Sequence, residues 1–174
     1  MRRRSFQVGF TIIELMVVIV VAAILVVMAA PSLVNTLAKK RLEGAAAELA
    51  TDIEYARSEA VHRNAAAGIV FAANCYTIYV LGSTNATNCT TLGTGATQLK
   101  TVQVGNGISL NLVPVTGGNA FIAFDPVRGM AIDAAAGATD LSGYIDVTSS
   151  AGNWQVRNLV TRVGRVKTCS PNGT

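Results

Sequence analysis

Four positively charged side chains lie within a short stretch near the C-terminus: Arg157, Arg162, Arg165 and Lys167, which we call the basic cluster. Arginine and lysine bind phosphate oxygens, and the planar guanidinium can do so with two parallel hydrogen bonds. In a regular strand Arg165 and Lys167 would face one side and Arg162 the other. Gly164 could form a bend or bulge that brings these three together. The pattern predicts a phosphate-binding surface, and the alternative is a basic edge strand kept soluble by its charge.

The chain holds few groups suited to catalysis. Its one histidine, His62, has no nucleophile-elbow sequence beside it, so a surface or packed histidine is the expected role. Gly93 and Gly95 are not followed by the Gly-Lys-Ser/Thr of a phosphate-binding loop. The usual ligand spacings of a metal site, such as CxxC, are missing. We therefore expect no enzyme, no cofactor and no metal site.

A single carboxylate interrupts a long apolar run near the N-terminus. The run covers residues 10–30, is followed by Pro31 and contains Glu14 as its one charge. As a helix it would be roughly 32 Å long at ~1.5 Å per residue, which is enough to cross the bilayer core. A carboxylate at mid-bilayer costs about 2.5–3.5 kcal/mol, so Glu14 is tolerable there only if a cation joins it.

The residues before this run indicate its orientation. Three arginines at positions 2–4 precede it, and positive charges favour the cytoplasmic side, so we expect the N-terminus inside and the remainder outside. A secretory signal is cut after its apolar stretch, whereas the only leader-like boundary here, Gly9–Phe10, lies before it. A plain single-pass anchor would explain the helix but neither this boundary nor Glu14.

The segment from Gly9 to Leu15, Gly-Phe-Thr-Ile-Ile-Glu-Leu, resembles the leader junction of type IV pilins and type II secretion pseudopilins. The resemblance implies cleavage after Gly9 by a prepilin peptidase and N-methylation of Phe10. It also implies that Glu14 meets the N-terminal amine of a neighbouring subunit, and that Pro31 bends the helix. The chain would first cross the bacterial inner membrane once, and would then join other pilins or pseudopilins in a filament of the periplasm or cell surface.

Periodicity divides the rest of the chain into a helix and a strand-rich part. After the apolar run, alanine is frequent and apolar side chains recur at three-to-five spacing, which indicates that an amphipathic helix continues the first one. The apolar positions are Leu33, Leu37, Leu42, Ala46, Leu49, Ile53, Ala56 and Ala60. We therefore predict an α+β fold. It would have a leader at 1–9, a transmembrane helix at 10–30, its amphipathic continuation at 31–66, and a β-rich domain of antiparallel strands at 67–174.

The predicted strands combine β-branched and aromatic residues with polar ones, and Gly, Asn, Ser and Thr clusters separate them. They are Gly68–Phe71, Tyr76–Leu81, Gln98–Val104, Ile108–Val113, Ala120–Phe124, Tyr144–Thr148 and Trp154–Val166. Longer loops are expected at Gly82–Gly95, Gly117–Asn119 and Ala134–Asp140.

The chain has three cysteines, Cys75, Cys89 and Cys169. Outside the membrane they would meet an oxidising compartment, in which disulfides persist. A Cys75–Cys89 disulfide would close a short polar loop and is our first prediction, with Cys169 left over. Either of the other pairings stays open.

Charge is unevenly distributed along the chain. The formal net charge is +4, and loss of the leader with its three arginines would leave +1. Residues 151–174 carry +4 and no acid, so the rest of the mature chain would carry −3. This asymmetry points to the C-terminal region as an interaction surface.

The order of an alanine-rich helix, with Tyr-Ala-Arg-Ser-Glu-Ala at residues 55–60, and a short β domain resembles the GspH/FimT group of minor pilins and pseudopilins. Residues 164–167, Gly-Arg-Val-Lys, are similar to the GRxR motif of FimT-like pilins that bind DNA in natural transformation. Lys167 replaces the last arginine, which keeps the charge but loses the planar fork. The resemblance implies a minor pilin whose basic cluster contacts double-stranded DNA. The rival interpretation is a minor pseudopilin of type II secretion with a purely structural role.

Overall fold

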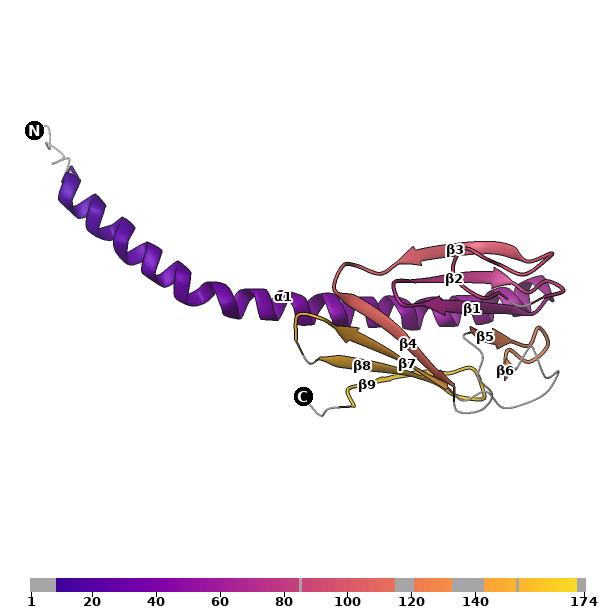
Figure 1. The fold of residues 1–174 in the computed structure, drawn as a ribbon. Helices are drawn as coiled ribbons and strands as arrows, with labels where there is room; N and C mark the ends of the chain where they lie inside the picture. Colours follow the sequence, from indigo (N-terminus) through magenta and orange to yellow (C-terminus); the bar gives the residue numbers. More distant parts are fainter. Residues whose placement is uncertain (1–8, 85, 115–120, 133–142, 153, 172–174) are drawn as a thin grey trace, which may run out of the picture. The chain divides into compact units, whose positions relative to one another are not determined.

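The computed structural model describes residues 9–84, 86–114, 121–132, 143–152 and 154–171 (Figure 1). Its one helix within these ranges, α1, runs from Ile12 to Arg63. By their contacts the residues form two compact units, Met1–Leu37 and Ala38–Thr174, which we describe separately.

The first unit contains the N-terminal part of α1. Its large apolar side chains between Ile12 and Met28 are 50–82% exposed. No single straight helix of the described chain is long and apolar enough to cross a membrane; Ile12–Met28 and Ser32–Arg63 together, joined at a bend, are so by length and composition. The bend falls at residues 29–31, where Pro31 lacks a backbone N–H. The single membrane span at 10–30 stays a prediction.

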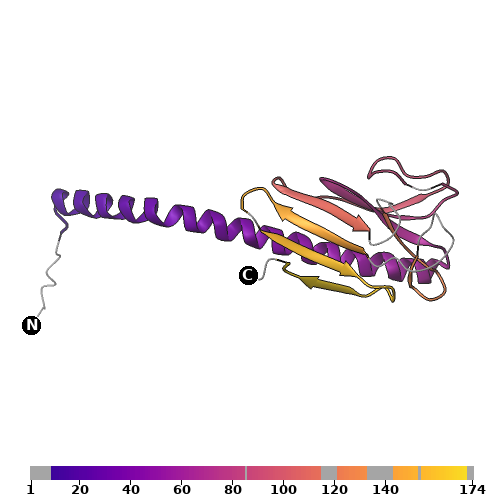
Figure 2. The ribbon, with the colours of Figure 1, turned by 60° about the horizontal axis from the view of Figure 1, so that its bottom comes forward.

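The second unit combines the rest of α1 with nine strands in the described ranges. They are β1 Ala67–Ala72, β2 Cys75–Val80, β3 Thr97–Gln103, β4 Ile108–Pro114, β5 Phe121–Phe124, β6 Ala131–Ile132, β7 Gly143–Ser149, β8 Gln155–Val160 and β9 Val166–Cys169. All neighbouring strands are antiparallel. They form a five-stranded sheet in the order β3-β2-β1-β5-β6 and a four-stranded sheet in the order β4-β7-β8-β9 (Figures 1 and 2). The fold is therefore α+β, as predicted.

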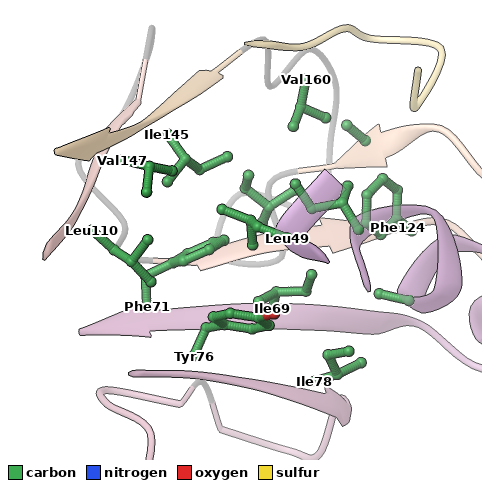
Figure 3. Close-up of a cluster of buried hydrophobic side chains, with 14 of the residues drawn as sticks. Leu49, Ile69, Phe71, Tyr76, Ile78, Leu110, Phe124, Ile145, Val147 and Val160 are labelled. Carbon is green, nitrogen blue, oxygen red and sulfur yellow. The ribbon is translucent and has the colours of Figure 1, made fainter. Parts of the chain in front are cut away.

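One face of α1 packs against both sheets. Its buried side chains recur at spacings of three and four residues: Leu42, Ala46, Leu49, Ile53, Ala56 and Ala60. Figure 3 shows Leu49 between Ile69 and Phe124 of one sheet and Ile145 and Val160 of the other. The apolar stripe predicted from periodicity is thus confirmed from Leu42 onward.

The helix ends at Arg63, slightly before the predicted boundary. Asn64 has a φ of 49°, in the left-handed region. The Asn64 N–H donates to the Val61 carbonyl and the Ala65 N–H to the Ala60 carbonyl, both at 3.2 Å. These bonds close the last turn and release the chain toward β1.

Buried polar contacts also tie α1 to each sheet. The Tyr76 hydroxyl donates to Asp52 at 2.7 Å, and the Lys100 ammonium donates to both Asp52 oxygens at 2.7 and 2.8 Å. Burial and the hydrogen bond to Asp52 raise the pKa of Tyr76, because both favour the neutral phenol. On the other sheet, the buried Asn158 amide donates to the Ala46 carbonyl at 2.8 Å.

Two features of the β domain differ from the prediction. The expected single strand Trp154–Val166 is divided into β8 and β9, because the chain turns at residues 161–165 and Val166 pairs back with Val160. The two-residue strand β6 was not predicted, since two residues are too few to show alternation. The loops predicted at Gly117–Asn119 and Ala134–Asp140 lie outside the described residues.

A disulfide joins Cys75 to Cys89, as predicted, with a Cα–Cα distance of 6.2 Å. It fastens Cys89, in the segment between β2 and β3, to the first residue of β2. The Thr77 hydroxyl adds a hydrogen bond to the Cys89 carbonyl at 3.0 Å. Cys169 lies exposed in β9, outside this disulfide.

Replacing both Cys75 and Cys89 with serine is expected to lower the free energy of unfolding by about 3 kcal/mol, since the disulfide restricts the unfolded chain over a loop of that length. Urea denaturation followed by fluorescence of the single tryptophan, Trp154, measures the change. Cys169→Ser is the matched control and should leave stability unchanged. Equal stability of the double variant and the parent would contradict the prediction.

Candidate functional site

The β8–β9 turn carries the centre of the basic cluster. The Thr161 N–H donates to the Arg165 carbonyl at 2.9 Å, and the Gly164 N–H donates to the Thr161 carbonyl at 2.8 Å. The Arg165 N–H also donates to the Thr161 hydroxyl at 3.2 Å. Gly164 has a φ of 73°, which favours glycine. The turn is therefore a defined structure, rather than the bend or bulge in one strand that the sequence suggested.

Three members of the basic cluster are exposed on this hairpin: Arg162 and Arg165 in the turn, and Lys167 in β9. Lys167 pairs in register with Leu159. Because Asn158 points toward α1, Leu159 and Lys167 face the other side of the sheet. Turn geometry, rather than strand alternation, sets the positions of the two arginines. The hairpin can thus present two guanidinium groups and one ammonium group to phosphate oxygens.

Arg157, the fourth member, is held within the sheet surface. Its guanidinium donates to both oxygens of Asp146 at 2.7 and 2.8 Å and lies 3.7 Å from the centre of the Tyr144 ring. The hydrogen bonds to Asp146 raise the pKa of Arg157. A carboxylate already offsets its charge, which argues against Arg157 as a phosphate contact.

The turn rests on two other parts of the domain. The Ala131 N–H of β6 donates to the Arg162 carbonyl at 3.0 Å, and the Val166 N–H donates to Glu54 of α1 at 3.4 Å. A Cβ added to Gly164 would lie 2.5 Å from the Gly129 carbonyl oxygen. Figures 1 and 2 both show the β8–β9 and β5–β6 turns at the same end of the domain.

The N-terminal residues of the predicted junction lie at the start of α1. Phe10 precedes the helix and is 81% exposed. The Thr11 hydroxyl accepts a hydrogen bond from the Glu14 N–H at 3.3 Å and so caps the first turn. Within the described ranges, the Glu14 carboxylate has no side-chain partner of its own chain.

The decisive comparison is with known families. The family model described as type II transport protein GspH matches residues 45–166, more than half of the chain. The chain belongs to the GspH family. The model of the prokaryotic N-terminal methylation motif matches residues 5–30, which include the Gly9–Phe10 boundary. Members of these families are pilins and pseudopilins, structural subunits that assemble with one another.

Solved structures share the fold of this GspH-family chain. The type IV minor pilin FimU of Pseudomonas aeruginosa has a TM-score of 0.55 and 17% identity, over 78% of this chain and 96% of FimU. The minor pseudopilin EpsH from the type 2 secretion system of Vibrio cholerae has a TM-score of 0.55 and 10% identity, over 75% of this chain and 98% of EpsH. A search of curated protein sequences finds no match. At these identities the structural likeness shows the fold alone.

Sequence reasoning about this GspH-family chain missed the residues that surround the turn. Arg57 of α1 donates its Nε–H to the Gly129 carbonyl at 2.8 Å, and exposed Arg128 precedes Gly129 in the β5–β6 turn. Together with Glu54 and Val61, these residues line a shallow hollow of about 180 Å³. The sequence shows the arginines and glycines of these segments, but only the tertiary fold brings α1 and the β5–β6 turn together.

The described ranges bring together no group of three His, Cys, Asp or Glu side chains able to hold a metal ion. The geometry of the GspH-family domain instead offers exposed cations on a turn with a defined backbone. That arrangement suits reversible contact with an anionic surface.

Proposed function

We propose that the chain is a minor pilin of a type IV pilus that contacts double-stranded DNA through its β8–β9 turn. A prepilin peptidase would cut it after Gly9, and Phe10 would then be N-methylated. Before assembly it would cross the inner membrane once, with a cytoplasmic N-terminus. It would join other pilins through its apolar helix, and the β domain would be the exposed part.

The assembly part of the proposal is supported by the apolar surface of α1 and by Glu14. The exposed apolar side chains of the first unit require lipid or neighbouring helices to cover them. Glu14 requires a cation in that setting, and the free amine of a cleaved neighbour at Phe10 would supply one. The N-terminal methylation motif covers the same residues.

The DNA-binding part of the proposal depends on one observation, the exposure of Arg162, Arg165 and Lys167 on a single hairpin. Duplex DNA presents a regular array of phosphates, and basic side chains bind it by releasing condensed counterions. The three residues carry most of the positive charge that distinguishes the C-terminal region. Arg157 is left out of the contact set because Asp146 already holds it.

The rival function is that of a minor pseudopilin in a type II secretion system, with a purely structural role. The matching family model is described as type II transport protein GspH, and EpsH and FimU have the same TM-score of 0.55 with this chain. Loss of the gene would distinguish the two. A pilus role in transformation predicts loss of DNA uptake, whereas a secretion role predicts loss of protein export.

The triple variant R162A/R165A/K167A is expected to bind duplex DNA more weakly and with less dependence on salt. Each lost phosphate contact flattens the log–log salt dependence by roughly 0.9, so three contacts make the parent lose about 40-fold more affinity than the variant between 50 and 200 mM salt. Titration of fluorescent duplex DNA with the full-length chain in neutral detergent measures both affinities.

The control removes three charges elsewhere, at Lys39, Lys40 and Arg41 of α1. This variant has the same net charge as the triple variant but keeps the three cations of the hairpin. It should bind DNA nearly as the parent does. If the control loses as much affinity as the triple variant, binding is unspecific. If the triple variant binds like the parent, the turn is not the site.

A further inference from the structure

We propose that Arg57 of α1 is a positioning residue for the DNA-contacting turn: it holds residues 161–165 in place through Gly129 and Gly164 without touching DNA itself. This inference rests on the proposed function. It joins two segments of the sequence, the alanine-rich helix and the C-terminal basic motif, into one structural unit.

The first contact of this unit lies between α1 and the β5–β6 turn. The Arg57 Nε–H donates to the Gly129 carbonyl at 2.8 Å. The terminal guanidinium nitrogen lies 3.6 Å from Glu54, one turn back on the helix, and the Arg57 side chain is 34% exposed. The guanidinium is therefore fixed from two sides, and one of these contacts is long-range.

The second contact lies between Arg57 and the β8–β9 turn. A Cβ at Gly164 would lie 2.5 Å from the Gly129 carbonyl oxygen, 2.8 Å from Arg57 Nε and 2.9 Å from Arg57 Cδ. Real Cβ atoms do not approach that closely, so the turn can rest on Arg57 only because residue 164 has no side chain. Gly164 serves close packing as well as the positive φ of the turn.

Neighbouring hydrogen bonds extend this support along the turn. Glu54 accepts from the Val166 N–H, directly after the turn, and Ala131 donates to the Arg162 carbonyl within it. These contacts order the backbone during folding, so that less ordering is required when a phosphate binds.

The contact geometry requires arginine at position 57. Lysine has no N–H at the place of Nε, and its ammonium lies farther along the chain, so it cannot donate to Gly129 while its stem packs against Gly164. Methionine keeps a similar apolar stem and loses all hydrogen bonds. Arg57→Lys and Arg57→Met therefore separate the charge of the residue from its hydrogen-bond geometry.

The test is a double-mutant cycle in the full-length chain. Arg57→Met is expected to lower duplex-DNA affinity about three- to tenfold, the loss that follows from reordering one or two side chains on binding. In the R162A/R165A background the same substitution should have no further effect, because no positioned arginine remains. Arg57→Lys should behave like Arg57→Met. The control Arg63→Met removes a guanidinium that pairs with Glu59 on the same helix and should leave affinity unchanged.

Hydrogen exchange of the turn amides provides a second measurement that does not depend on DNA. Arg57→Met should speed exchange of the Thr161 and Arg165 amides, while Trp154 fluorescence reports an intact fold. Gly164→Ala should produce the same change. Faster exchange is a result that a direct DNA contact by Arg57 alone would not produce.

Three results would overturn the inference, and a fourth would overturn the proposed function alone. If Arg57→Met lowers affinity equally in the parent and in R162A/R165A, Arg57 is a direct DNA contact. If Arg57→Met leaves affinity unchanged, Arg57 does not contribute to DNA binding. If the parent and R162A/R165A bind DNA equally, the proposed function fails, and amide exchange then decides whether Arg57 holds the turn. Unchanged exchange in Arg57→Met would refute that remaining part.

Discussion

Replacing Lys100 with methionine is expected to lower the free energy of unfolding by about 3 kcal/mol, the lower end of the range for breaking a buried ion pair. The Asp52 side chain is 8% exposed and receives the Lys100 ammonium at 2.7 Å. Without it, the carboxylate keeps the Tyr76 hydroxyl, and the described residues place no other cation at hydrogen-bond distance from it. The Lys100 side chain is 41% exposed, so water reaches part of the site and limits the loss. Urea denaturation followed by Trp154 fluorescence measures it.

Two further variants make this prediction specific. Lys40→Met breaks an exposed pair with Glu43, in which the lysine side chain is 71% exposed, and should cost less than about 0.5 kcal/mol. Adding Asp52→Asn to Lys100→Met should recover part of the lost stability, since the buried charge is then removed. A Lys100→Met loss as small as that of Lys40→Met would show that the buried pair does not matter.

The contact between α1 and the sheets was predictable because helical periodicity is a local signal. The buried positions from Leu42 to Ala60 recur every three or four residues, and the sequence alone identifies that face. The Cys75–Cys89 disulfide was also predicted, since the two cysteines lie only fourteen positions apart and close a short polar loop. The pairing of Asp52 with Lys100, forty-eight residues away, requires the fold.

The division of the last predicted strand could not be derived from alternation. Residues on both sides of Gly164 are β-branched or basic, and no Asn-Gly or Asp-Gly pair marks a tight turn. The turn instead depends on the left-handed φ of Gly164 and on hydrogen bonds between Thr161 and Arg165. A single glycine in a strand pattern is equally compatible with a bulge and with a turn.

The candidate site was predicted in part. The sequence located Arg162, Arg165 and Lys167 but could not separate them from Arg157, whose partner Asp146 depends on the register of β7 against β8. Arg57 lay beyond prediction for the same reason, because its contact with Gly129 spans seventy-two residues. Charge patterns thus identify candidate cations, and only the tertiary structure shows that Arg162, Arg165 and Lys167 are exposed on one hairpin while Arg157 is held by Asp146.

Replacing Glu14 with leucine is expected to abolish incorporation into filaments while leaving cleavage after Gly9 intact. The carboxylate disfavours the membrane-embedded state by about 2.5–3.5 kcal/mol at mid-bilayer, and somewhat less nearer the edge. A neighbour's Phe10 amine would neutralise it during assembly. Leucine makes the single subunit more stable in lipid and removes the attraction toward the next subunit, so both effects favour the unassembled state. Mass spectrometry of sheared filaments and membranes measures where the chain is found and whether it begins at Phe10.

Two control variants test whether the loss of incorporation comes from the loss of the negative charge rather than from misfolding. Glu14→Asp keeps the carboxylate on a shorter side chain and should retain part of the incorporation, whereas Glu14→Gln keeps the shape, lacks the charge and should fail like leucine. The Cys75–Cys89 disulfide should form in all variants, because it belongs to the other compact unit. Normal incorporation of Glu14→Leu would mean that apolar packing alone selects the position of the subunit. The acid would then have no role in assembly, and its place in the apolar run would need another cause.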